Sequence, residues 1–229
     1  TGRILFKALF TTVTNVSFDD ERIAQTTFDV LRHKDHVVRR LSAASLDQGD
    51  LPEIAGWTVE TGDTDGLQSR IPVASVLTDT NDDTRALREL ATYGLKGISA
   101  YGDHAGILGY EDPSIYREFA RLLAGTETLE DTEALTQLVL DTGALAVRVM
   151  ELLDRANTET YGNPEITQVN LGVRNRPGIL ISGHDLRDMH ELLEQSKDSG
   201  VDIYTHGEML PANSYPVFKR YDHFVGNYG

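Results

Sequence analysis

The spacing of apolar residues predicts a mainly helical first part of the chain. Apolar residues recur every three to four positions in several long segments, which is the period of an amphipathic helix. These predicted helices cover residues 4–16, 19–41, 84–108, 112–124 and 131–156. The last three can bury their apolar stripes against one another, so we expect a helical domain over residues 1–156 that contains a three-helix bundle.

Residues 42–83 interrupt this pattern. The segment carries four glycines, two prolines and many aspartates and threonines. Such residues are typical of turns and irregular segments. We therefore predict a long loop here, with at most two short strands, at Trp57–Glu60 and Val73–Leu77.

Glycine is frequent in the predicted helix 84–108. A glycine costs about 1 kcal/mol relative to alanine in an exposed helix, so we expect these positions to lie in close contact with a neighbouring helix. They are Gly94, Gly97, Gly102 and Gly106. Gly109 is expected to end this helix, and Asp112 followed by Pro113 is a typical start for the next one.

The pattern changes after Asn157 to short apolar runs between polar segments. We predict a loop, a strand, a helix, a strand and a final short strand. These elements cover 158–170, 177–183, 185–197, 201–207 and 223–229. Strand, helix and strand within about thirty residues form a βαβ unit, whose strands are parallel and whose crossover is right-handed. Residues 157–229 are therefore expected to be the first part of an α/β domain.

Parallel sheets need cover on both faces and are rarely limited to two strands. We therefore expect the sheet to be Rossmann-like and to continue beyond residue 229. The predicted fold class is α/β and multidomain, with an N-terminal helical bundle followed by the start of a parallel sheet. Both ends of the sequence look cut within an element, so we expect an internal fragment of a longer protein, with a complete small protein as the alternative.

Composition narrows the possible partners. The 229 residues carry a net charge of −15, and 40% of them are apolar, which is enough for a core. The acidity argues against nucleic acid or an anionic membrane as partner, because phosphate binding needs a clustered basic surface. No run of about 18 apolar residues predicts a membrane span. Without a signal-peptide pattern, we expect a soluble, cytoplasmic protein.

His184 and Glu208 are the strongest candidates for chemistry. Functional groups of parallel sheets gather at the carboxyl ends of the strands, and each of these residues follows a glycine at the end of a predicted strand. Asp185 is then expected to cap the next helix, which leaves the imidazole available. Imidazole and carboxylate together suit iron, zinc or manganese. The alternative is a histidine bonded to its own loop and a glutamate at a helix start.

The remaining candidates are weaker. His206 lies two residues before Glu208, but a lone strand histidine is more often structural. The other histidines are predicted to be packed, solvated or without a recognisable partner. They are His33, His36, His104 beside Asp103, His190 and His223. With no cysteine in the chain, neither disulfides nor thiolate ligands can come from these residues. No G-x-G-x-x-G, P-loop, G-x-S-x-G or H-E-x-x-H motif occurs.

Several segments resemble the hybrid cluster proteins, also called hydroxylamine reductases. The most specific are TYGNPEITQVNLGV (160–173), PGILISGHDL (177–186), VDIYTHGEMLPA (201–212) and YPVFKRYDHFVGNYG (215–229). LFTTVTN (9–15) and LKGISAYGDHAGILGY (95–110) resemble the N-terminal helical domain of that family. The resemblance covers nearly the whole chain and is weakest over 42–83.

The resemblance implies a redox enzyme with two iron–sulfur centres. Members of the family have a helical domain and two α/β domains, a 4Fe-4S cubane and a hybrid 4Fe-2O-2S cluster. Matched by motif, His184 and Glu208 fall on ligands of the hybrid cluster, and the iron that they bind is expected to open a coordination position for substrate. The implied reaction is reduction of hydroxylamine to ammonia and water, with nitric oxide as another attributed substrate, and a redox electron donor as partner.

All cysteine ligands and a second glutamate ligand of that family are missing from these residues. Two alternatives stay open. One is a relative of carbon monoxide dehydrogenase, which the G-H-D-L and T-H-G-E-M-L-P strings fit less well. The other is a non-catalytic α/β module that has lost its clusters.

Overall fold

The computed structural model describes residues 1–13, 18–45, 53–74 and 81–229. The chain divides into two compact units, which are described separately. The first comprises residues 1–103 and 112–150, and the second comprises residues 104–111 and 151–229. No helix within the described ranges combines the length and the apolar character that a bilayer crossing requires.

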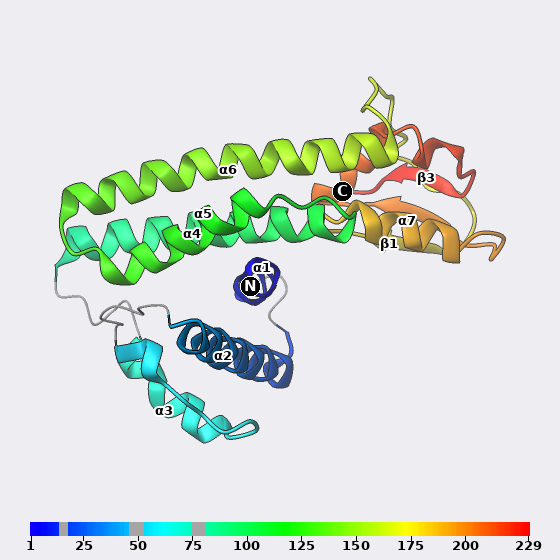
Figure 1. Ribbon diagram of the computed structural model, residues 1–229. Helices are drawn as coiled ribbons and strands as arrows, with labels where there is room; N and C mark the ends of the chain where they lie inside the picture. Colours follow the sequence, from blue (N-terminus) through cyan, green and yellow to red (C-terminus); the bar gives the residue numbers. More distant parts are fainter. Residues whose placement is uncertain (14–17, 46–52, 75–80) are drawn as a thin grey trace. The chain divides into compact units, whose positions relative to one another are not determined.

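The first unit is helical, as predicted. Its helices are α1 (Gly2–Phe10), α2 (Asp20–Ala43), α3 (Thr64–Ala74), most of α4 (Asp82–Ile107), α5 (Pro113–Thr128) and the first part of α6 (Thr132–Tyr161) (Figure 1). The predicted start at Asp112 is confirmed, because its carboxylate accepts the N–H of Ser114 at 2.7 Å. Asp19 caps α2 in the same way and accepts the N–H of Arg22 at 3.0 Å.

Two of the four α4 glycines lie in close contacts with other helices. A Cβ atom at Gly94 would lie 2.8 Å from Thr142 of α6, and one at Gly102 would lie 2.0 Å from the ring of Phe6 in α1. The prediction was wrong for the other two, since a Cβ at Gly97 or at Gly106 would meet nothing within 4 Å. Those two positions face open space rather than a neighbouring helix.

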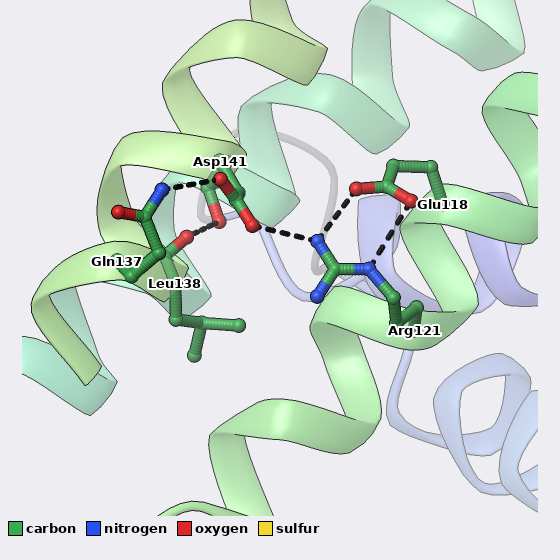
Figure 2. A network of polar contacts seen from close by, with 6 residues as sticks. Glu118, Arg121, Gln137, Leu138 and Asp141 are labelled. Atoms are coloured by element: carbon green, nitrogen blue, oxygen red, sulfur yellow. Dashed lines mark hydrogen bonds and ion pairs between the residues drawn. The ribbon is translucent and has the colours of Figure 1, made fainter. Parts of the chain in front are cut away.

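A charged network ties α5 to α6 (Figure 2). Arg121 of α5 donates to Glu118 on its own helix at 2.6 Å and to Asp141 of α6 at 2.8 Å. Asp141 also accepts a hydrogen bond from Gln137 at 2.7 Å. These bonds hold the pKa of the Asp141 carboxyl below its usual value, through Gln137 first and then Arg121.

The long loop predicted over 42–83 is wrong in part, because the segment contains α3 and a short 3₁₀ turn, η1 (Glu53–Gly56). The Asp63 carboxylate accepts the N–H of Gly66 at 2.8 Å, which caps the start of α3. The aspartates and glycine that indicated a turn are therefore the start of a helix. Trp57–Glu60 forms no strand. Of Val73–Leu77, the first two residues belong to α3, and the rest lie outside the described residues.

The second unit contains the predicted parallel sheet. Its strands are β1 (Gly178–Ile181), β2 (Asp202–Thr205) and β3 (Phe224–Asn227), hydrogen-bonded in the order β1-β2-β3. Both pairings are parallel, and Gly178 is opposite Asp202 at the start of the first. Helix α7 (Leu186–Gln195) connects β1 to β2, so the predicted βαβ unit is confirmed.

Side chains from α6, α7 and the segments around β2 and β3 form the core of this unit. Its largest fully buried members are Tyr161, Met189, Leu193, Ile203 and Phe218. Tyr161 is the last residue of α6, which continues four residues into the predicted loop 158–170. That part of the loop prediction was wrong, because the aromatic ring of Tyr161 packs on Phe218 at a centroid distance of 4.9 Å.

Candidate functional site

His184 and Glu208 lie together at the carboxyl edge of the sheet. His184 follows β1, Glu208 follows β2, and these strands are adjacent. The Nε2 atom of His184 is 4.0 Å from Oε2 of Glu208, which is too far for a hydrogen bond. The structure thus brings together the two side chains that the sequence singled out, and their role as ligands stays a prediction.

The backbone at both positions turns through a glycine. Gly183 has φ +119° and Gly207 has φ +53°, values that side-chain-bearing residues rarely adopt. Asp185 accepts the N–H of Arg187 at 2.7 Å and so caps α7, as predicted. Because Asp185 serves the helix, the histidine before it is left to project from the strand end.

Both side chains are accessible. The side chain of His184 is 45% exposed and that of Glu208 is 76% exposed. Within the part of the chain that the structure describes, neither side chain makes a hydrogen bond, so their nitrogen and oxygen lone pairs are available. Metal–nitrogen and metal–oxygen bonds to a first-row ion such as zinc are about 2.0–2.2 Å long. Two donors 4.0 Å apart therefore lie within the span that one ion can bridge.

The pair is only part of a metal site. No group of three or more His, Cys, Asp or Glu side chains suited to a metal ion occurs among the described residues. The donor types fit iron, but two donors leave most of its coordination positions to other ligands.

A buried polar cluster lies next to the turn that carries Glu208. Thr205, Asn213 and Asn227 are all buried, and the hydroxyl of Thr205 joins the three. It accepts a hydrogen bond from Asn213 Nδ2 at 2.8 Å and donates one to Asn227 Oδ1 at 3.0 Å. Nothing in the sequence pattern indicated this cluster, because its members are 8 and 22 residues apart along the chain.

His206 lies beside this edge of the sheet but is bonded elsewhere. Its Nδ1 atom is 3.4 Å from the hydroxyl of Ser182, the last residue before Gly183. A Cβ atom at Gly229 would lie 2.4 Å from the imidazole ring of His206, so this ring is packed against the backbone there.

The structure gives partners to two histidines for which the sequence indicated none. His223 Nε2 is 2.9 Å from the hydroxyl of Ser196. His190 packs edge-on against Tyr161 at a centroid distance of 5.7 Å, within a group of aromatic rings that includes Phe218. His223 and His190 therefore make contacts within the fold and are not part of the His184–Glu208 site.

Tyr161 and Asp188 are among the ionisable groups of this unit whose pKa values are displaced. Burial, followed by repulsion from Asp185, raises the pKa of Tyr161 to about 12. The same two causes raise the pKa of Asp188 in α7. The phenolic hydroxyl of Tyr161 is buried and has no hydrogen-bond partner within the described part of the chain.

Comparison with known proteins places these observations in a family context. The model of the Prismane/CO dehydrogenase family matches residues 1–229. The chain is 50% identical over 236 residues to a hydroxylamine reductase of Halothermothrix orenii, an alignment that covers all of this chain and 42% of that protein. It is 50% identical to a hydroxylamine reductase of Methanocaldococcus jannaschii, over 97% of this chain and 41% of the relative. The chain spans about two-fifths of the length of these curated relatives.

Proposed function

Because the chain belongs to the Prismane/CO dehydrogenase family, we propose that it is part of a hydroxylamine reductase. In this reaction hydroxylamine takes up two electrons and two protons, its N–O bond breaks, and ammonia and water are released. The full-length protein would thus be an oxidoreductase that acts on a small nitrogenous compound, with a redox partner that supplies the electrons. A cytoplasmic location fits this role.

The family assignment implies iron–sulfur clusters, and this chain has no cysteine to ligate them. The proposed clusters are a 4Fe-4S cubane and a hybrid 4Fe-2O-2S centre. Their thiolate ligands would come from residues outside these 229, since the relatives are more than twice as long. When bound, the hybrid centre supplies electrons and Lewis-acidic iron.

The observation that carries the proposal is the 4.0 Å approach of His184 to Glu208. We assign to this chain one imidazole and one carboxylate ligand of the hybrid centre. Neutral imidazole nitrogen and carboxylate oxygen are suited to iron, and carboxylate ligands exchange more readily than thiolates. The carboxylate of Glu208, which is 76% exposed in this chain, would hold iron of the hybrid centre as one of its oxygen ligands.

The proposed function also implies a division of the chain into two domains. We propose that residues 1–156 form a helical domain and that residues 157–229 begin the α/β domain that carries the two ligands. In this arrangement the helical part contributes structure, and the strand ends contribute the chemistry.

The test is substitution of the ligands in the full-length protein. Glu208→Ala and His184→Ala should abolish hydroxylamine turnover and change the visible absorption of the iron centre. Glu191→Ala serves as the control, because Glu191 is a surface carboxylate of α7, 47% exposed, that pairs with Arg187 rather than with His184. Wild-type turnover and absorption in Glu208→Ala would overturn the assignment. Carbon monoxide oxidation without hydroxylamine reduction would instead favour a carbon monoxide dehydrogenase activity, and a protein without iron would favour a non-catalytic module.

A further inference from the structure

The side chain of Glu208 has no packing of its own to hold it in place. It is 76% exposed, and within the described residues it pairs with the imidazole of His184, 4.0 Å away. The position of the Glu208 backbone, and with it the reach of the carboxylate, is set by the turn that carries it. That turn is the 3₁₀ segment η3 (Gly207–Ser214), which starts where β2 ends.

The backbone of η3 is anchored on the core side. Met209, the residue after Glu208, is 2% exposed and belongs to the apolar core of the second unit, together with Ala212. The N–H of Met209 donates to the carbonyl of His206 at 3.1 Å. The far end of the turn is also held, because the N–H of Glu165 donates to the carbonyl of Ser214 at 2.9 Å.

Side-chain hydrogen bonds of Thr205 and Asn213 join the middle of the turn directly to the end of β2. Thr205 is fully buried as the last residue of β2, three positions before Glu208. Its hydroxyl accepts from Asn213, five positions after Glu208, at 2.8 Å. Asn213 also donates to the carbonyl of Leu210 at 2.9 Å, so one side chain binds both the turn and the strand end.

The same hydroxyl extends the cluster to the neighbouring strand. Thr205 donates to Asn227 Oδ1 at 3.0 Å, and the carbonyl of Thr205 accepts the N–H of Tyr228 at 2.8 Å. The hydroxyl oxygen of Thr205 therefore joins the end of β2 both to the end of β3 and to η3. A buried amide that loses its partner is costly, so the cluster resists any shift of the turn.

We propose that Thr205 and Asn213 are positioning residues that hold the Glu208 turn in register with His184. This inference rests on the proposed function, since it concerns the same pair of ligands. Partners behind metal ligands typically change metal affinity or activity by 10- to 100-fold when removed. The two residues act through Glu208 and need not touch iron or substrate themselves.

Thr205→Val in the full-length protein tests this proposal, because valine has the shape of threonine without the hydroxyl. We expect hydroxylamine turnover and iron content to fall at least tenfold, the visible absorption of the iron centre to change, and Thr205→Ser to restore all three. Thr142→Val is the matched control. Thr142 is also buried, at 3% exposed, and donates its hydroxyl to the carbonyl of Leu138 within α6 at 2.8 Å.

The outcomes separate this inference from the proposed function. Loss of iron in Glu208→Ala with wild-type turnover and absorption in Thr205→Val would overturn the positioning role alone. No effect in Glu208→Ala would overturn the proposed function itself. Asn213→Ala is the second variant, and it should reproduce the change in absorption. If both variants fail to fold while Thr142→Val folds, the cluster serves folding rather than positioning, and the proposal is wrong.

Discussion

Gly226 of β3 lies directly against the backbone of Asn170, a residue 56 positions earlier in the chain. A Cβ atom at Gly226 would be 2.0 Å from the carbonyl oxygen of Asn170, and the N–H of Asn227 donates to that same oxygen at 2.9 Å. The polar segment before β1 is thereby fastened to the far edge of the sheet. Because the obstacle is backbone, no side-chain rotation can make room.

Gly226→Ala should therefore destabilise the second unit. We expect a loss of about 1–3 kcal/mol, the usual cost of forcing extra volume into a packed place. The measurement is the thermal unfolding midpoint of the full-length variant. An unchanged midpoint would show that this contact is looser than the structure indicates.

Replacing two glycines of α4 by alanine should change the stability of the protein in opposite directions. Gly97→Ala should raise stability by about 0.5–1 kcal/mol, because the position is exposed, helical and open. Gly102→Ala should lower it by about 1–3 kcal/mol, because the buried ring of Phe6 would have to move. Chemical denaturation of the two variants measures both free energies of unfolding. Changes of the same sign and size in both variants would contradict the prediction.

The buried hydroxyl of Tyr161 predicts a loss of stability in strong alkali. The unfolded state loses its phenolic proton near pH 10 and the folded state near pH 12, because burial raises the pKa. The stability contributed by this group is therefore complete below pH 10 and falls as the pH rises from 10 to 12. Tyr161→Phe should remove that part of the pH dependence, measured from unfolding midpoints at pH 9 and pH 11.

At neutral pH, Tyr161→Phe should be neutral or slightly stabilising. The hydroxyl has no hydrogen-bond partner within the described residues, so its removal breaks no such bond and relieves the cost of burying it. The gain is expected to be at most about 1–2 kcal/mol. A clear destabilisation of Tyr161→Phe would mean that the hydroxyl is hydrogen-bonded in solution.

The ion pair between Arg121 and Asp141 should contribute little to the free energy of unfolding. The side chains are 53% and 32% exposed, so solvent screens the attraction, and Arg121→Gln should cost less than about 1 kcal/mol. The effect should shrink further as salt is raised from 0.1 M to about 1 M. Unfolding midpoints at the two salt concentrations check this, and a cost that does not depend on salt would contradict an electrostatic origin.

Most of the fold was predictable because it depends on local pattern. The 3.6-residue period located the long helices, and the strand–helix–strand order implied parallel strands whose carboxyl ends meet. That implication by itself predicts His184 beside Glu208, where the structure has them. Helix α3 was missed because Asp63 and Gly66 suit a helix cap as well as a turn, and the sequence alone does not decide between them.

The supporting contacts could not be predicted in the same way. The bond from Asn213 to Thr205 and the bond from Thr205 to Asn227 join residues whose spacing follows no regular period. Whether a glycine such as Gly97 faces a neighbour depends on how the helices are rotated about their axes. Both are properties of the packed structure, which the pattern of apolar residues constrains only loosely.

The position of β1 at the edge of the sheet affects how these 229 residues behave when handled alone. One side of β1 pairs with β2, while its other side presents backbone donors and acceptors, and Ile179 and Leu180 are 41% and 52% exposed. Such an edge is a template for adding a further strand. We expect these 229 residues, prepared by themselves, to self-associate through that edge. Leu180→Lys should prevent this self-association.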